Sequence, residues 1–124
     1  GGGAAFVALR ADGAVLLRTR PAKGLLGGMT EVPTTAWLHD FDERQALDEA
    51  PRFPAKRKMN WRRMAGVVRH VFTHFPLELA VYAAELPVRT AAPSGTWWAK
   101  ISELPGEALP SLMRKVVAHA LPSD

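Results

Sequence analysis

The chain has 124 residues and a formal net charge of +4, from 16 Lys and Arg against 12 Asp and Glu. This length predicts one domain over residues 1–124, which can bury roughly two thirds of the surface that the unfolded chain exposes. The chain has no cysteine, which excludes a disulfide framework, a thiol nucleophile and a cysteine-ligated metal or iron–sulfur cluster. Apolar runs fall short of the roughly 18 residues that cross a bilayer, so no membrane partner is expected. Gly1–Gly3 ahead of Ala4, with no initiator Met, indicate a cloning remnant or a cut from a longer chain.

The positive charge is concentrated in one segment. Residues 51–77 contain seven Lys and Arg and no Asp or Glu, whereas residues 1–50 have a net charge of −2 and residues 78–124 a net charge of −1. Such a segment is typical of proteins with a polyanionic partner, because Lys and Arg displace the cations condensed on a phosphate backbone. A solvated loop without a specific partner is an equally good interpretation. The basic residues of this segment are Arg52, Lys56, Arg57, Lys58, Arg62, Arg63 and Arg69.

The first half of the chain predicts a β-hairpin, a short strand and a helix. Residues 4–11 and 14–20 are strand-like runs on either side of Asp12-Gly13, a dipeptide that suits the two positive φ angles of a type I′ turn. The glycine-rich residues 24–28 then lead into a short strand that ends at Pro33. Residues 40–50 predict a helix of two or three turns with acids at its N-terminal end, and residues 51–60 predict a loop.

The second half predicts three strands and a helix. Residues 66–73 and 77–85 are the first two strands, joined by His74-Phe75-Pro76, and residues 96–101 are the third. Between Leu109 and Leu121 the apolar residues recur at helical spacing, with prolines at both ends. Two helices against a mixed sheet predict an α/β/α layered domain.

Single motifs say little about chemistry. His70, Phe72 and His74 share one face of an extended strand, where the two imidazoles are too far apart to share a metal ion easily. Gly24–Gly28 can cradle a phosphate but lacks the Lys-Ser/Thr of a P-loop. No serine lies in a G-x-S-x-G elbow. Thr73 and His74 lie where a strand turns over, a place where loop residues either meet a ligand or satisfy the turn's own hydrogen bonds.

Two segments taken together resemble a known family. RPAKGLLGGMTEVP at residues 20–33 and RHVFTHF at residues 69–75 resemble the C-terminal domain of A/G-specific adenine DNA glycosylases, the MutY family. The resemblance covers essentially the whole chain. It implies the Nudix fold of the MutT-type hydrolases, an α/β/α sandwich with a mixed sheet and two main helices.

The box that holds magnesium in active Nudix hydrolases has the form Gx5Ex7REUxEExGU, and its carboxylates are missing here. If residues 32–35 are laid over its start without gaps, Thr35 replaces the first Gly and Phe41 the first Glu. The Arg-Glu and Glu-Glu pairs then fall on Glu49-Ala50 and Phe53-Pro54. A hard divalent cation needs clustered carboxylates, so we expect no metal site and no catalysis by this chain.

The resemblance implies recognition of 8-oxoguanine paired with adenine in duplex DNA. The family's lesion-reading Phe-Ser-His turn matches Phe72, Thr73 and His74, with Thr73 and its N–H facing the oxidised edge of the guanine. It also implies a separate N-terminal glycosylase domain as partner, which excises the adenine, carries a 4Fe-4S cluster and lies outside this chain. We expect a cytoplasmic, nucleoid-associated bacterial protein. The residues expected on the DNA backbone are Arg57, Lys58, Arg62, Arg63 and Arg69.

The chain departs from the family pattern at three positions, and two other functions are compatible with the sequence. Thr73 stands where many relatives have Ser, Thr30 where the family usually has Trp, and Val32 where it usually has Phe. The first alternative is a free-standing Nudix hydrolase with an unusual acid set. Its acids would be Asp42, Glu43, Asp48 and Glu49. The second is a docking module whose basic segment binds an acidic protein.

Overall fold

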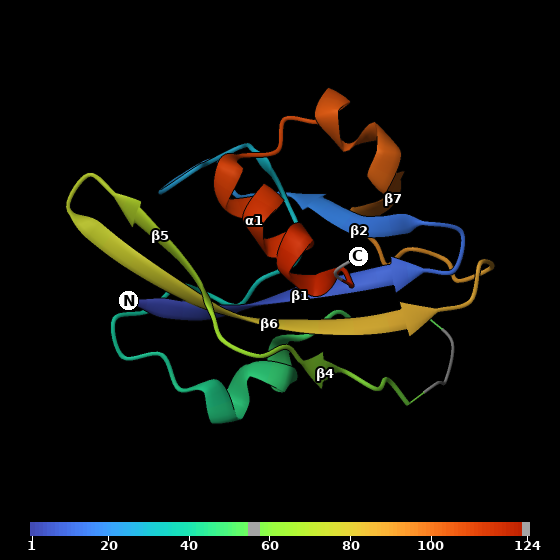
Figure 1. The fold of residues 1–124 in the computed structure, drawn as a ribbon, viewed down its shortest axis with the longest axis horizontal. Helices are drawn as coiled ribbons and strands as arrows, with labels where there is room; N and C mark the ends of the chain where they lie inside the picture. The colour runs from blue at the N-terminus through green and yellow to red at the C-terminus, as the bar shows by residue number, and fades with distance from the viewer. Residues whose placement is uncertain (55–57, 123–124) are drawn as a thin grey trace.

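The structure is a computed structural model that describes residues 1–54 and 58–122. One seven-stranded mixed sheet organises the chain (Figure 1). The strands are β1 (Gly2–Arg10), β2 (Ala14–Thr19), β3 (Thr30–Glu31), β4 (Arg62–Arg63), β5 (Val68–Phe72), β6 (Phe75–Leu86) and β7 (Thr96–Lys100). The helices are η1 (Glu43–Glu49) and η2 (Ile101–Gly106), both 3₁₀, and α1 (Ser111–Ala120). No helix in the described ranges is long and apolar enough to cross a membrane.

The sheet is built around one parallel pair, β1 and β6, aligned from Gly2 opposite Glu78 to Arg10 opposite Leu86. Every other pairing between strands of the described residues is antiparallel. Two short strands pair with the edge of β6 that faces away from β1. β5 pairs with the first half of β6, and β4 pairs with Tyr82 and Ala83 further along. The mixed sheet that the sequence predicts is therefore confirmed.

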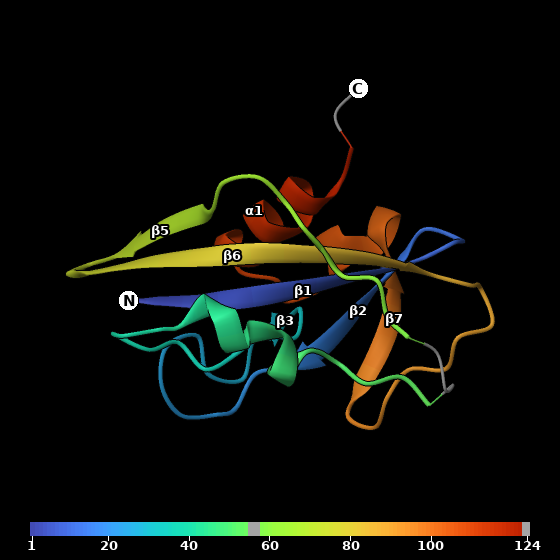
Figure 2. The same ribbon diagram turned by 90° about the horizontal axis from the view of Figure 1, so that it is seen from below.

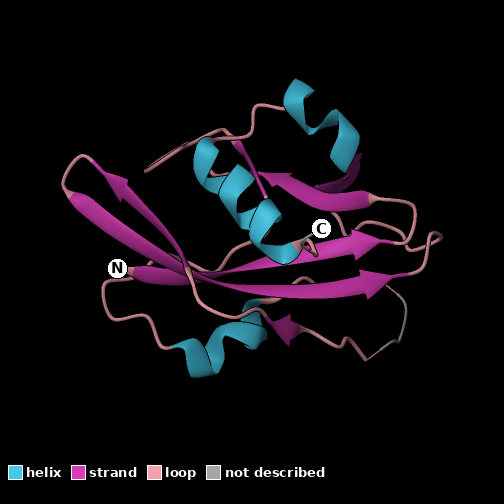
Figure 3. Ribbon diagram, viewed as in Figure 1, coloured by secondary structure: helices cyan, strands magenta, loops and turns pink. Residues whose placement is uncertain are grey.

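Side chains that alternate along β1 and β6 form a core on each face of the sheet. Ala5, Val7, Leu79 and Val81 face α1, whose buried stripe completes the larger core. On the opposite face Ala4, Phe6, Ala80 and Tyr82 pack under η1. Figure 2 shows α1 on one side of the sheet and η1 on the other, and Figure 3 distinguishes the helices from the strands by colour. These two covering layers correspond to the predicted layered arrangement.

The covering helix of the second face differs from its prediction. Residues 40–50 form a 3₁₀ helix limited to Glu43–Glu49, with the Asp42 carboxylate accepting from the Arg44 N–H at its start. Only Ala46 of this helix is buried, and Leu47 is 50% exposed. Without an apolar stripe there is little packing energy to hold a regular α-helix, since most helical stability in proteins comes from such a stripe. Only one of the two predicted main helices is therefore an α-helix.

Two predicted turns also take a different form. The first hairpin has a three-residue connection, and only Gly13 in it has positive φ, at 88°. The N–H of Gly13 donates to the Arg10 carbonyl at 2.9 Å, as in hairpins that close with a glycine in the left-handed region rather than a type I′ turn. In the second hairpin Phe72 pairs with Phe75, so the connection is Thr73-His74 and not residues 74–76.

Gly2 and Gly3 are part of the fold and not a tail. They begin β1 opposite Glu78 and Leu79, and Gly3 is buried. A Cβ on Gly3 would lie 2.9 Å from Cδ1 of Trp37 and 3.1 Å from Oγ1 of Thr35. Glycine is therefore required at this position by the close approach of Trp37.

A polar cluster joins η1 to the sheet. The Tyr82 hydroxyl donates to Oε2 of Glu43 at 2.6 Å, and Nε of Arg63 lies 2.8 Å from the same oxygen. Burial, together with this hydrogen bond to Glu43, raises the pKa of Tyr82 to about 12. The Arg63 guanidinium, and then the Tyr82 hydroxyl, hold the pKa of Glu43 below its usual range.

Because Tyr82 is the only tyrosine of the chain, its titration can be followed by tyrosinate absorbance. We expect a midpoint near pH 12 in the folded protein, and near 10 in urea. The raised pKa contributes stability that is complete below pH 10 and is lost between about 10 and 12. Glu43→Gln removes a charge that favours the neutral phenol and should lower the midpoint. A midpoint near 10, with circular dichroism still that of the folded chain, would contradict the cluster.

Candidate nucleic-acid interface

The β5–β6 hairpin is an arm that carries the predicted lesion-recognition residues at its tip. Figure 1 shows it projecting beyond the N-terminal end of β1. Thr73 and His74 form the two-residue connection and both are exposed, while Phe72 is half-buried. Neither Thr73 nor His74 has a positive φ angle, and a β-branched residue such as Thr73 disfavours that left-handed region. The turn therefore presents both side chains to solvent at the end of a two-stranded arm.

Aromatic rings support the tip from one side. The ring of Phe72 stacks on Phe75 across the hairpin with 6.3 Å between centroids, and on Trp37 with 6.4 Å. His70 contacts the edge of Phe72 at 4.8 Å. Trp37 lies between β3 and η1 in sequence, so it fixes the arm to the body of the domain. Such ring pairs stabilise by about 0.5–1.5 kcal/mol each beyond the area they bury.

An arginine completes this column beneath Trp37. The guanidinium carbon of Arg20 lies 3.6 Å from the centroid of the Trp37 ring, a cation–π contact. Arg20 also donates from Nη1 to Oε1 of Glu31 at 2.9 Å, and Arg18 donates from Nε to Oε2 at 2.8 Å. Glu31 is only 1% exposed. The column therefore runs from a buried carboxylate, through Arg20 and Trp37, to Phe72 at the base of the turn.

The glycine-rich loop holds Arg20 in this place. Nε of Arg20 donates to the Leu25 carbonyl at 2.7 Å. Within the loop the N–H of Gly27 bonds to the Gly24 carbonyl, and the N–H of Gly28 bonds to the Arg20 and Pro21 carbonyls. A Cβ on Gly27 would lie 2.2 Å from the Ala22 carbonyl oxygen. These N–H groups serve the loop's own turns, so the loop acts on Arg20 and not as a phosphate cradle.

The predicted backbone-binding residues lie in two places. Arg69 is exposed on β5, within the arm. Arg62 and Arg63 are on β4, opposite Ala83 and Tyr82, seven residues along β6 from Phe75 and therefore about 23 Å from the tip at 3.3 Å per residue. Lys58 is exposed in the segment that precedes β4, and Arg57 lies outside the described residues.

The two arginines of β4 already have acceptors within the chain. Arg62 donates from Nη2 to Oε2 of Glu85 at 3.1 Å. Arg63 pairs with Glu43 and donates from Nη1 to the carbonyls of Met64 and Gly66 at 2.6 and 2.8 Å. Arg69 forms no ion pair with any of the described residues. Of the described arginines in the predicted set, Arg69 is the one without an ion pair, although Glu78 lies opposite it in the β5–β6 register.

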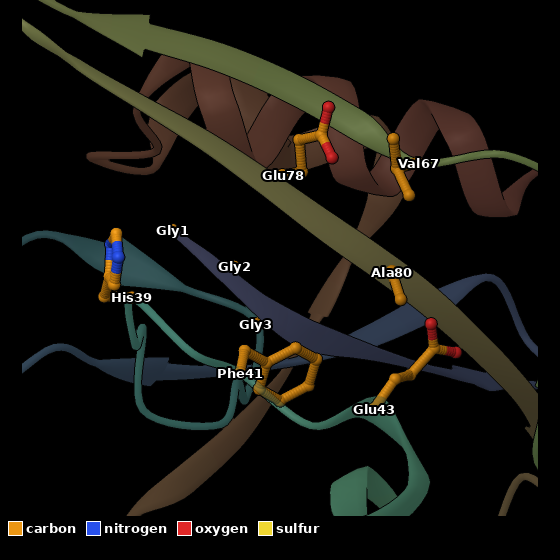
Figure 4. Close-up of a pocket in the computed structure, with 9 residues that line it drawn as sticks. All are labelled: Gly1, Gly2, Gly3, His39, Phe41, Glu43, Val67, Glu78 and Ala80. Atoms are coloured by element: carbon orange, nitrogen blue, oxygen red, sulfur yellow. The ribbon is translucent and has the colours of Figure 1, made fainter.

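A cleft of about 250 Å³ lies beside the first residues of β1, on the face that carries η1. Figure 4 shows Phe41, Glu43 and Glu78 among the side chains around it. Phe41 occupies the place of the first box glutamate, and Glu43 is paired with Arg63. Over the described parts of the chain, no three Asp, Glu or His side chains are placed to share a metal ion.

The acids of the alternative hydrolase are dispersed. Asp42 caps η1 and pairs with Arg44, with 3.0 Å between Oδ1 and Nε. Glu43 is bonded to Arg63 and Tyr82, while Asp48 and Glu49 are exposed. The structure therefore gives this acid set no common focus for a cation.

Sequence reasoning missed Trp37 and the role of Arg20. Arg18, in β2, and Arg20, just after its end, occupy alternate positions, and that spacing could have indicated a shared acidic partner on a neighbouring strand. Nothing local in the sequence places Trp37 against Phe72, because the two are 35 positions apart. The family's Trp position holds Thr30, which is buried and bonds through its N–H to the Ala108 carbonyl.

The chain has clear relatives. The NUDIX domain family model matches residues 4–119. The chain is 32% identical over 108 residues to the human adenine DNA glycosylase and 34% identical over 111 residues to the mouse adenine DNA glycosylase. Each match covers 82% of this chain, and the chain spans about a fifth of the length of these relatives (20% and 21%).

Solved structures of two proteins have a fold similar to that of this chain. The C-terminal domain of mouse MUTYH, solved in complex with human PCNA, superposes with a TM-score of 0.69 at 27% identity, over 99% of this chain and 92% of that one. A MutT protein from Methanosarcina mazei Go1 gives a TM-score of 0.67 at 15% identity, over 94% and 89% of the two chains. That second likeness shows the fold alone. The chain belongs to the NUDIX domain family, and it is homologous to the C-terminal domain of adenine DNA glycosylases.

Proposed function

We propose that this chain is the lesion-recognition domain of an A/G-specific adenine DNA glycosylase and that it reads 8-oxoguanine opposite adenine in duplex DNA. One observation carries the proposal: the Phe72-Thr73-His74 turn stands exposed at the end of an arm that an aromatic column fixes to the domain. Homology to adenine DNA glycosylases over most of the chain supports it.

The chemistry of the turn suits the lesion. 8-Oxoguanine differs from guanine by an oxygen at C8, which accepts a hydrogen bond, and by a protonated N7, which donates one. The Thr73 N–H can donate to that oxygen, and the Thr73 hydroxyl can accept from N7. Guanine lacks the oxygen and so leaves the Thr73 N–H without an acceptor, and its unprotonated N7 can pair with the Thr73 hydroxyl only if that hydroxyl donates instead of accepting. Phe72 anchors the turn, and His74 orients it or contacts the DNA backbone.

The rest of the activity belongs to another part of the same protein in this proposal. The adenine is excised by an N-terminal glycosylase domain that carries a 4Fe-4S cluster. This chain has no cysteine with which to ligate such a cluster. Lys58, Arg62, Arg63 and Arg69, with Arg57, contribute a basic surface for the duplex. The protein acts on chromosomal DNA, in the nucleoid of a bacterial cytoplasm.

The Thr73 hydroxyl can be tested with a matched pair of variants in the full-length glycosylase. Thr73→Val keeps the branched shape and removes the hydroxyl, whereas Thr73→Ser keeps the hydroxyl. We expect Thr73→Val to lower the preference for 8-oxoguanine:adenine over guanine:adenine about five- to thirtyfold, because an unpaired polar group costs about 1–2 kcal/mol. Thr73→Ser should retain the preference, and His74→Ala should lower it. The assignment would be wrong if the wild type excised adenine equally well opposite 8-oxoguanine and opposite guanine, or if Thr73→Val were as selective as the wild type.

The aromatic column predicts that Trp37, which has no place in the turn itself, also controls selectivity. Trp37→Leu removes the ring between Arg20 and Phe72, and we expect a loss of about 2–4 kcal/mol in the free energy of unfolding. Lesion preference should fall as well, since the arm loses its support. Trp37→Phe restores a ring and should recover much of the preference. If Trp37→Leu unfolds at a lower urea concentration but keeps full preference, the arm does not depend on the column.

A further inference from the structure

A groove between β5 and the second half of α1 is lined by cations from both elements. Its lining residues are Val67, Val68, Arg69, Lys115, Ala118 and His119, and its volume is about 450 Å³. Figure 2 shows α1 and β5 on the same side of β6. Lys115 and His119 are four positions apart on α1, so their side chains lie on one face of that helix. The groove is therefore lined by three basic residues from two segments that are distant in sequence, and the side chains of Lys115 and His119 belong to its α1 wall.

None of the described residues that line this groove is acidic, although Glu78 lies opposite Arg69 on the neighbouring strand β6. Residues 51–77, which include β4 and β5, contain no Asp or Glu, and neither do residues 108–122, which include α1. Among the described residues, Arg69 and Lys115 take part in no ion pair. Both are exposed. Packing α1 against β5 thus extends the basic segment with charge that its own residues do not supply.

The groove residues also have a structural role, which any test must separate from binding. Nζ of Lys115 donates to the Arg69 carbonyl at 3.1 Å, and Nε2 of His119 lies 2.7 Å from the Ala65 carbonyl oxygen. These contacts attach β5, and the segment that leads into it, to α1. One hydrogen bond uses only one of the three donors of an ammonium group, and it leaves the positive charge in place.

We propose that this groove binds a backbone phosphate of the duplex through Lys115 and His119 of α1, beside Arg69 on β5. The inference rests on the proposed function and deepens it, because it adds α1 to the DNA-binding surface. β5 forms one wall of this groove and also one strand of the arm that ends at Thr73. We therefore expect a duplex that is read by the arm to pass beside the groove. Contacts of this kind position the DNA and carry no sequence information.

The test measures the affinity of the 124-residue chain for two short duplexes, one with 8-oxoguanine:adenine and one unmodified, by NMR titration at several salt concentrations. Lys115→Gln keeps a donor for the Arg69 carbonyl and removes the charge, and Lys115→Arg keeps the charge. Arg89→Gln, at an exposed position in the loop after β6, is the matched control for loss of one charge. The ¹H–¹⁵N spectrum of each free variant reports whether its fold is intact.

We expect Lys115→Gln to weaken binding to both duplexes by the same factor, up to about tenfold at 0.1 M salt, and to reduce the slope of log affinity against log salt by about one. Lys115→Arg should restore both, and Arg89→Gln should change neither. An unchanged slope for Lys115→Gln, or an effect no larger than that of Arg89→Gln, overturns the groove and leaves the lesion-reading arm standing. Equal wild-type affinity for the two duplexes, with the Lys115 effect present, overturns lesion reading and supports the groove. Absence of binding to either duplex overturns both.

Discussion

The buried carboxylate of Glu31 is the constraint on which the candidate site depends. A carboxylate that is 1% exposed is stable as an ion only if cations and hydrogen bonds replace its water. Arg18 and Arg20 supply both, and each is thereby fixed in one orientation. Arg20 in its fixed orientation lies over Trp37, and Trp37 supports Phe72 at the base of the exposed turn. In this way a charge pair inside the domain determines how a surface turn is presented.

The distribution of internal ion pairs separates structural cations from available ones. Arg62 and Arg63 lie in the most basic part of the sequence, yet each is paired with a glutamate from another segment. Arg63 in particular joins η1 to the sheet through Glu43 and Tyr82. Replacing it would therefore change the fold as well as any DNA contact. Arg69 and Lys115 form no such pair among the described residues, and they are the better reporters of electrostatic binding.

Local patterns in the sequence predict most strands, the first hairpin and the terminal helix, because turn residues and apolar periodicity are properties of neighbouring positions. The helical stripe between Leu109 and Leu121 predicts α1 almost to its ends. Residues 40–50 carry acids suited to a helix start but bury only Ala46, so their tertiary context limits them to a 3₁₀ helix. The short strand β4 is defined only by its pairing with Tyr82 and Ala83, and no alternation in its two residues could reveal it.

The resemblance to adenine DNA glycosylases predicted the turn at Phe72-Thr73-His74, but not what supports it. Trp37 reaches Phe72 through the folding of the chain, and the groove between β5 and α1 joins residues 46 or more positions apart. Val71 is 61% exposed on the arm, as expected for a strand with only one face on the core. The contact of Trp37 with Phe72 and the groove between β5 and α1 depend on how whole elements pack, so no single segment of the sequence could predict them.

Lesion recognition in this proposal depends on the backbone N–H of Thr73, which donates to the C8 oxygen of 8-oxoguanine. The most direct measurement is the hydrogen-exchange rate of the Thr73 amide in the free chain and in complexes with two duplexes that differ only in the oxidation of one guanine opposite adenine. We expect the 8-oxoguanine duplex to slow exchange at Thr73 by at least about tenfold more than the guanine duplex, with Arg89 as an unaffected reference. Equal protection of Thr73 by both duplexes, or protection confined to residues outside the arm, would contradict it.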